Sequence, residues 1–142
     1  MRKSVRAIII QNNKLLVIER KFPDDLYWVL PGGGIEKSDV DEKSAIQREC
    51  KEEAGVEIIV GKKIWNRKFK GNPEKYFLCT IIGGQVQKGN GPEYQDNNND
   101  YYGTHKPKWL PLDKLKNYNL LPHEIKDIIN QNSRISEISE RS

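Results

Sequence analysis

Three consecutive glycines, Gly32 to Gly34, separate a short apolar segment from a strongly charged one. Glycine has no Cβ, so a run of three lets the main chain turn sharply and approach another group closely. In the following residues 41–54, apolar side chains recur every four positions, which is the period of an amphipathic helix. Gly55 stands just past this helix, where glycine commonly ends one. The sequence therefore predicts a strand, a glycine turn, a helix and then a second strand at residues 56–60.

Strand and helix signals continue along the rest of the chain. Apolar, β-branched runs bounded by polar or glycine-containing turns predict strands at residues 5–10, 15–18, 27–30, 64–69, 76–82 and 109–111. Two further helices are expected at residues 113–115 and 122–130. The polar segment 87–103 predicts a long surface loop near or over a site. We expect a single domain at residues 1–132 and a frayed tail at residues 133–142.

The central helix concentrates negative charge on one face. Residues three and four apart are neighbours on a helix surface, so Glu49, Glu52 and Glu53 are expected to cluster. Glu42 should lie about two turns earlier on the same side, and Ala45 should lie among the acids and leave room for another group. Like charges at this spacing destabilise a helix, and so do anions near its C-terminal end. A divalent cation would remove both penalties, because Mg²⁺ takes oxygen ligands and binds phosphates as well.

A solvated helix face is the alternative interpretation of these charges. Acidic helix faces are common, and Lys43, Lys51 and Arg48 can offset the glutamates. The surrounding sequence favours the metal site, because a glycine-rich turn precedes the helix, a glycine ends it, and Arg48 stands beside the acids.

The segment RECKEEAGV, residues 48–56, resembles the second half of the signature of the Nudix hydrolase superfamily. That signature reads G-x5-E-x7-R-E-U-x-E-E-x-G-U, in which U is an aliphatic residue, and Cys50 stands at the first U position. The lead-in WVLPGGGIE, residues 28–36, is also typical of the family, with Gly33 as the signature glycine. The similarity in layout extends over most of the chain, to WLPLDKL near its end.

The front of the signature departs from the family pattern. Counted from Gly33, the signature glutamate falls on Asp39, and eight residues rather than seven separate Asp39 from Arg48. Counted back from Arg48, the same position is Val40, which carries no acid. We interpret this as a one-residue insertion before the helix, with Asp39 or Asp41 in place of the glutamate. Asp39 is thus a candidate additional acid of the site, and either aspartate can instead cap the helix.

The resemblance implies a fold, an activity and a set of site residues. The implied fold is an α/β/α sandwich with a mixed β-sheet, with the signature helix on one side and the C-terminal helix on the other. Glu49, Glu52, Glu53 and Arg48 are the implied catalytic residues: the three glutamates would bind Mg²⁺ or Mn²⁺, and Arg48 would orient a glutamate. The implied enzyme hydrolyses the pyrophosphate bond of a nucleoside diphosphate linked to another group. A nucleotide-binding sensor without catalytic activity is the alternative.

Further candidates for the site lie outside the helix. Gly33 and Gly34 can bring main chain close to the substrate. Arg20 can meet a phosphate across the site, and a surface arginine at a strand end is the equally weighted alternative. Members of the family often add an acidic ligand or base from a distant loop. Glu93 and Asp100 are the candidates in this chain.

Composition limits the setting and the partners. The chain is 36% apolar and 31% charged, and its apolar runs are too short for a transmembrane helix or a secretory signal. We therefore expect a cytoplasmic protein with no membrane partner, in which Cys50 and Cys79 are buried thiols. The formal charge of +4 is compatible with a phosphorylated small-molecule substrate. Nothing in the sequence indicates an oligomeric state.

Nucleic acid is not the favoured partner. Residues 62–70 form a basic stretch, but no base-stacking pattern accompanies it, and exposed strands commonly carry lysine. Tryptophan side chains in small α/β domains pack in the core or at its rim more often than they stack a base. His105 and His123 have no partners at metal-ligand spacing and are expected to be structural or exposed.

Overall fold

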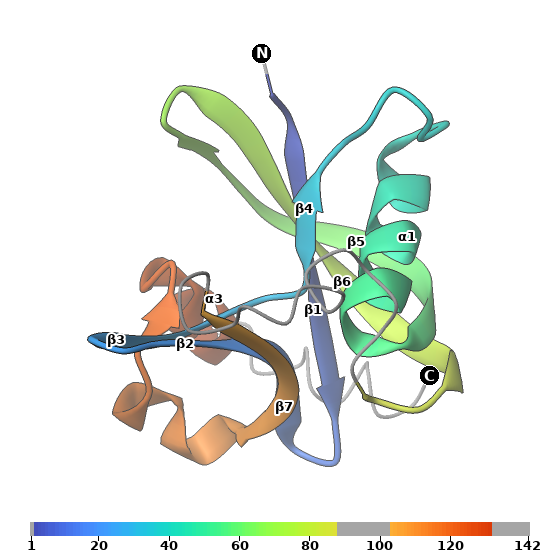
Figure 1. Ribbon diagram of the computed structural model, residues 1–142. Coiled ribbons are helices and arrows are strands. Elements are labelled where there is room, and N and C mark those ends of the chain that lie inside the picture. The colour runs from blue at the N-terminus through green and yellow to red at the C-terminus, as the bar shows by residue number, and fades with distance from the viewer. Residues whose placement is uncertain (1, 88–102, 132–142) are drawn as a thin grey trace.

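The computed structural model describes residues 2–87 and 103–131 (Figure 1). Within those ranges one mixed sheet is built from β1 (Ser4–Gln11), β2 (Lys14–Phe22), β3 (Asp25–Val29), β4 (Gly32–Gly34), β5 (Val56–Phe69), β6 (Asn72–Gly84), β7 (Thr104–Pro111) and β8 (Leu120–Leu121). The helices are α1 (Glu42–Ala54), the 3₁₀ helix η2 (Leu112–Asn117) and α3 (Glu124–Gln131). Most of the predicted loop, with Glu93 and Asp100, and the predicted tail lie outside the described residues.

The sheet divides into two parts that share one tight turn. Its strand order is β5-β6-β1-β2-β3-β8, with β4 on β1 and β7 on β2. β1 and β2 pair only beside their connecting turn, where Ile10 faces Leu15. Asn12 and Asn13 form that turn with φ of 51° and 63°, a backbone that asparagine tolerates and that two-residue hairpins need. From there β1 continues with β4 and β6, and β2 continues with β3 and β7 (Figure 1).

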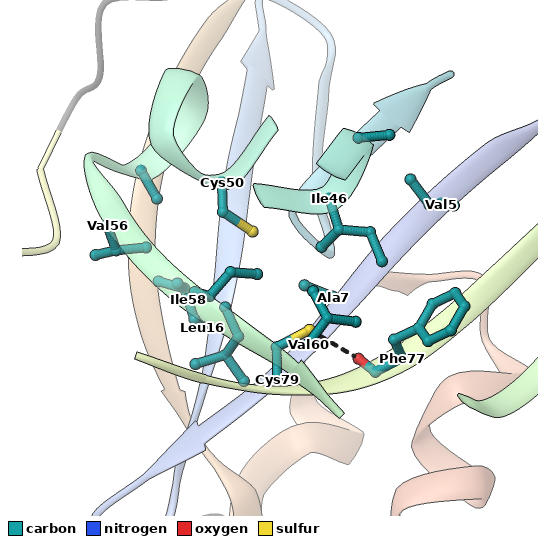
Figure 2. Close-up of a cluster of buried hydrophobic side chains, with 13 residues drawn as sticks. Val5, Ala7, Leu16, Ile46, Cys50, Val56, Ile58, Val60, Phe77 and Cys79 are labelled. Atoms are coloured by element: carbon teal, nitrogen blue, oxygen red, sulfur yellow. Dashed lines mark hydrogen bonds between the residues drawn. The ribbon is translucent and has the colours of Figure 1, made fainter. Parts of the chain in front are cut away.

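Alternation along β1 places a hydrophobic core on each face of the sheet. Val5, Ala7 and Ile9 join the cluster beneath α1, which Figure 2 shows with Ile46 and Cys50 pointing into it. Even-numbered β1 residues such as Ile8 join the second cluster, to which α3 and η2 also contribute. Successive strand residues point to opposite faces, so the apolar run Ala7–Ile10 must be covered on both. The predicted sandwich of a mixed sheet between helices is confirmed.

Capping residues define both ends of the signature helix, α1. The side chain of Asp41 accepts a hydrogen bond from Ser44 N at 2.8 Å, which fixes the N-terminus of α1. Gly55 ends the helix with φ of 71°, in the left-handed region that glycine favours. The apolar stripe that includes Ile46 is buried as predicted. Ala45 does not lie open among the acids: it is fully buried in the core, where its small side chain lets α1 pack closely on the sheet.

Three strand predictions need correction. Residues 56–60 and 64–69 form one strand, β5, because the segment between them continues the ladder through register shifts rather than turning. Gly32 to Gly34 form the short strand β4 rather than a turn. A Cβ on Gly32 would lie 2.1 Å from the carbonyl oxygen of Val5, so only glycine allows this pairing. β7 begins at Thr104, ahead of the predicted 109–111, since its polar first half pairs with the far end of β2.

Two other expectations can be compared with the described residues. Cys50 and Cys79 are both buried free thiols, as expected, and burial raises the pKa of Cys79 to about 12. No helix in residues 2–87 or 103–131 has the length and apolar character needed to cross a membrane.

Candidate active site

Arg48 joins an acid of the loop before α1 to acids in the C-terminal half of that helix. Its Nε and Nη2 atoms donate to the two carboxylate oxygens of Asp39, each at 3.0 Å. Its Nη1 lies 3.2 Å from carboxylate oxygens of both Glu49 and Glu52. The guanidinium group also donates to the carbonyl oxygen of Gly34 at 3.2 Å, which ties the glycine segment to the helix.

Asp39 and Asp41, the two aspartates in the part of the sequence that differs from the family signature, have separate roles. The side chain of Asp39 is only 5% exposed, and its hydrogen bond to Arg48 holds the pKa of that carboxyl below its usual value. Asp41 instead caps α1. Val40, between them, is 90% exposed, so its side chain projects into solvent. Of the two aspartates, therefore, Asp39 is the one that pairs with the signature arginine.

Glu53 and Glu49 lie against the glycine segment. Glu53 is buried, and its Oε1 accepts a hydrogen bond from the main-chain N–H of Gly32 at 2.9 Å. A Cβ on Gly33 would lie 2.8 Å from Glu49 Oε1, so the bare main chain is what admits this carboxylate. Burial, with the neighbouring negative charge of Glu52, raises the pKa of Glu49. Gly32 and Gly33 therefore bring the main chain close to the acids of α1.

The three signature glutamates differ in their position relative to the cleft. Glu49 and Glu53 line one cleft, while Glu52 is not among its lining residues and instead accepts a hydrogen bond from Arg48. Glu42 does not join them, because its carboxylate is 2.8 Å from Lys75 Nζ on β6. Across the described residues, no three carboxylate, imidazole or thiol groups converge closely enough to hold a metal ion as they stand. The chemistry of the donors nevertheless fits a hard divalent cation, because partly buried carboxylates lie beside main-chain polar groups.

The cleft beside these acids has a volume of about 390 Å³ and a wall rich in cations. It is lined by Arg2, Arg6, Ile18, Arg20, Tyr27, Val29, Gly32, Gly33, Gly34, Glu49, Glu53 and His105. The sequence-derived candidates Arg20, Gly33 and Gly34 are therefore brought to the same cleft as Glu49 and Glu53. The Nε of Arg20 donates to the carbonyl oxygen of Thr104 at 3.2 Å, which orients its guanidinium group.

Sequence reasoning missed three cationic or titratable residues of this cleft. Arg6 interrupts the apolar alternation of β1, which was a usable signal, and its Nη1 donates to the carbonyl oxygens of Leu30 and Gly32 at 3.0 and 3.2 Å. Arg2 and His105 gave no signal in the sequence. Burial, followed by the charge of Arg20, lowers the pKa of His105 to about 4, so this imidazole is neutral at neutral pH.

Comparisons with known proteins agree with this architecture. The NUDIX domain family model matches residues 1–130. An RNA pyrophosphohydrolase of Pelagibacter ubique (strain HTCC1062) is 24% identical, with 92% of this chain and 94% of that protein covered. An RNA pyrophosphohydrolase of Orientia tsutsugamushi (strain Boryong) is 30% identical, with 84% of this chain and 80% of that protein covered.

Solved structures show the same fold. A NUDIX hydrolase from Nitrosomonas europaea matches with a TM-score of 0.71 and 17% identity, covering 93% of this chain and 88% of that one. An ADP-ribose pyrophosphatase from Streptococcus suis matches with a TM-score of 0.67 and 22% identity, covering 94% and 92%. The match of the family model over nearly the whole chain confirms the predicted family and enzyme class: the chain belongs to the Nudix hydrolases.

Proposed function

We propose that this protein hydrolyses the pyrophosphate bond of a nucleoside diphosphate linked to another group, with Mg²⁺ or Mn²⁺ as cofactor. The observation that carries the proposal is the pairing of charges in one cleft. Glu49 and Glu53 enter it from α1, and Arg6 and Arg20 enter it from β1 and β2. A bound metal would neutralise the negative charge of the glutamates, and a diphosphate would neutralise the positive charge of the arginines. A metal–diphosphate complex would therefore satisfy both sets of charge in the cleft.

Each group of the site has a distinct part in this proposal. Glu49, Glu53 and, after a shift away from Arg48, Glu52 would hold the metal. A divalent metal supplies a Lewis acid for phosphoryl oxygens and lowers the pKa of water. Arg48 would keep Glu49 oriented, because Asp39 fixes the guanidinium from the other side. Arg20 would align the diphosphate for in-line attack.

A substrate panel in isotopically labelled water tests the proposal. Nucleoside triphosphates, nucleotide sugars and dinucleoside polyphosphates are incubated with Mg²⁺ or Mn²⁺, and the products are identified by mass. We expect cleavage of a phosphoanhydride bond and label on one phosphate product. Cleavage of another kind of bond would contradict the proposed reaction. A ligand that binds tightly and stays intact through a long incubation would contradict it as well and favour the sensor alternative.

A matched pair of variants links the activity to the acids of the cleft. Glu53→Gln keeps the shape of the side chain and removes its charge, so turnover at saturating Mg²⁺ should fall at least about a hundredfold. Glu42→Gln makes the same change on the same helix, at a carboxylate that pairs with Lys75 outside the cleft. It should leave turnover within about twofold, as surface substitutions usually do. Unchanged turnover in Glu53→Gln would rule out the assignment of this glutamate.

The 5′-triphosphate end of RNA is a second candidate substrate. Relatives over most of the chain are named RNA pyrophosphohydrolase, and on β5 the lysines Lys62, Lys63 and Lys68 are exposed. A strand that displays cations can follow an RNA backbone, although the sequence did not favour this partner. Turnover of a triphosphorylated oligoribonucleotide should then fall more steeply with salt than turnover of the free nucleotide. Equal salt dependence, unaltered by changing the three lysines to glutamine, would exclude RNA contact along β5.

A further inference from the structure

A second cavity adjoins the cleft that holds the signature acids. Its volume is about 440 Å³, within the range of small-molecule sites. Arg6, Tyr27 and Val29 line both spaces, so a ligand can extend from one into the other. The remaining lining residues are Leu30, Arg67, Phe69, Glu74, Tyr76, Leu121, Pro122, His123 and Glu124. The wall combines three aromatic rings with aliphatic side chains, which suits a flat apolar group such as a nucleobase.

Arg67 is held in this wall with part of its guanidinium group uncommitted. Its Nε donates to Glu74 Oε1 at 2.8 Å, and its Cζ lies 4.8 Å from the centre of the Phe69 ring. The side chain of Tyr76 is a second hydrogen-bond partner of this group. The guanidinium plane is thus held by Glu74, Tyr76 and Phe69, and because the group carries five N–H donors, further donors can meet a ligand in the cavity that Arg67 lines.

Glu74 pairs with Arg67 and holds it in place, so we do not assign it a contact with the ligand. It is 5% exposed, accepts from the hydroxyl of Tyr76 and the Nε of Arg67, and has Arg6 Nε at 3.7 Å. Although burial acts in the opposite direction, these donors hold the pKa of Glu74 below its usual value, and the carboxylate stays charged. Both hydrogen bonds fall on Oε1, and the charge of the carboxylate is matched by the two arginines.

The charge balance of the cavity argues against a phosphate as its occupant. Arg6 and Arg67 are matched there by the carboxylates of Glu74 and Glu124, so an added anion would find little net positive charge. The neighbouring cleft, with Arg2, Arg6 and Arg20, is the better place for phosphates. A neutral group with two adjacent acceptors would satisfy the fork without adding charge.

We propose that this cavity binds the base of the substrate, and that Arg67 selects a 6-keto purine such as guanine or hypoxanthine. The inference rests on the proposed function, which places the diphosphate in the adjoining cleft. A keto purine presents O6 and N7 side by side, and a bidentate arginine is the commonest protein partner of that edge. Adenine presents an amino donor at position 6, which would oppose the donors of Arg67, and a pyrimidine lacks the second acceptor.

Nucleotide analogues on the unaltered protein test the proposal first. The kcat/KM values for guanine and hypoxanthine nucleotides should agree, because both bases keep O6 and N7. Adenine, and 7-deazaguanine, which lacks the N7 acceptor, should each be at least about fivefold poorer, the lower limit for losing a bidentate pair. Equal kcat/KM for all four bases would overturn the base assignment while leaving the proposed hydrolysis intact. Failure to cleave any base would instead contradict the proposed function itself.

A pair of neighbouring variants then assigns the selectivity to Arg67. Arg67→Lys keeps the positive charge but loses the planar fork, so the preference for guanine over adenine should fall to within about twofold. Asn66→Ala changes the preceding residue on β5, which is exposed and does not line the cavity, and should keep the preference. Calorimetric binding of GMP and AMP without metal gives a second readout that is independent of turnover. A preference that survives in Arg67→Lys in both assays would remove Arg67 as its source.

Discussion

At the scale of single residues, Asp39 and Asp41 have different roles at the start of α1. Asp39 turns inward and pairs with Arg48 through both oxygens, while Asp41 turns outward and caps α1. The carboxylate of Asp39 also accepts a hydrogen bond from the N–H of Glu36 at 2.8 Å, so the loop and Arg48 fix it together.

Removing the Asp39 carboxylate should loosen Arg48 and, through it, Glu49. We expect Asp39→Ala to reduce kcat/KM by about 10- to 100-fold, the usual cost of losing a group that orients a metal ligand. Asp39→Glu should restore part of that loss. Asp41→Ala, which removes only the helix cap, should lower the thermal unfolding midpoint and leave kcat/KM nearly unchanged. The three variants are compared by steady-state kinetics and thermal unfolding; a larger kinetic loss in Asp41→Ala than in Asp39→Ala would reverse the two roles.

At the scale of elements, the close approach of β4 to α1 makes two adjacent glycines respond differently to the same change. In Gly33→Ala the added methyl would meet the end of the Glu49 side chain at 2.8 Å, which can move aside. The fold should survive, and the Mg²⁺ concentration for half-maximal activity should rise by roughly an order of magnitude. In Gly32→Ala the methyl would meet backbone, and φ is 148°, so the protein should lose more than about 1 kcal/mol of stability. Metal titration and urea unfolding distinguish the two; an unaltered metal requirement in Gly33→Ala would count against Glu49 as a ligand.

Glu74 joins three strands through buried charge, and this link gives the protein a measurable pH dependence. Arg6 on β1, Arg67 on β5 and Tyr76 on β6 all face its carboxylate. Because the pKa of Glu74 is lower in the folded chain than the ordinary 4.5, its contribution to stability is present above that value and is lost as the pH falls through the folded one. Glu74→Gln should be less stable near neutral pH, and the difference from the unaltered protein should shrink toward about pH 3. Urea midpoints across this range measure the difference; a constant gap would contradict the lowered pKa.

The elements also show what the sequence could and could not predict. The buried stripe of α1 and its end at Gly55 follow from periodicity and capping, which are local, and they were found correctly, whereas the capping residue at its start was left open until the structure identified Asp41. The strand formed by Gly32 to Gly34 was missed, since glycine carries no strand propensity and its pairing with β1 depends on tertiary contact. Arg6 and His105 were missed for a related reason. Their place in the cleft is decided by how β1 and β2 diverge, and no local pattern encodes that divergence.

At the scale of the whole molecule, β1 makes the two hydrophobic cores one cooperative unit. Its odd-numbered residues lie beneath α1 and its even-numbered apolar residues lie beneath α3, so neither core can open without exposing the other side of the same strand. Arg6 of the same strand lines both the cleft beside the α1 acids and the neighbouring cavity. Damage to either core should therefore reach the whole protein.

Equal truncations in the two cores test this coupling. Ile46→Ala and Ile125→Ala each remove a fully buried side chain, one from each cluster, and each should lower the free energy of unfolding by about 2–5 kcal/mol. Ile59→Ala, at a side chain that is 57% exposed, is the control and should change the free energy of unfolding by less than about 0.5 kcal/mol.

Trp109 packs on the first cluster and Trp28 and Trp65 on the second, so tryptophan fluorescence reports on both. In every variant, urea unfolding followed by fluorescence and by far-ultraviolet circular dichroism should give one coincident transition, because β1 belongs to both cores. Two separated transitions in either core variant would show that the cores unfold independently.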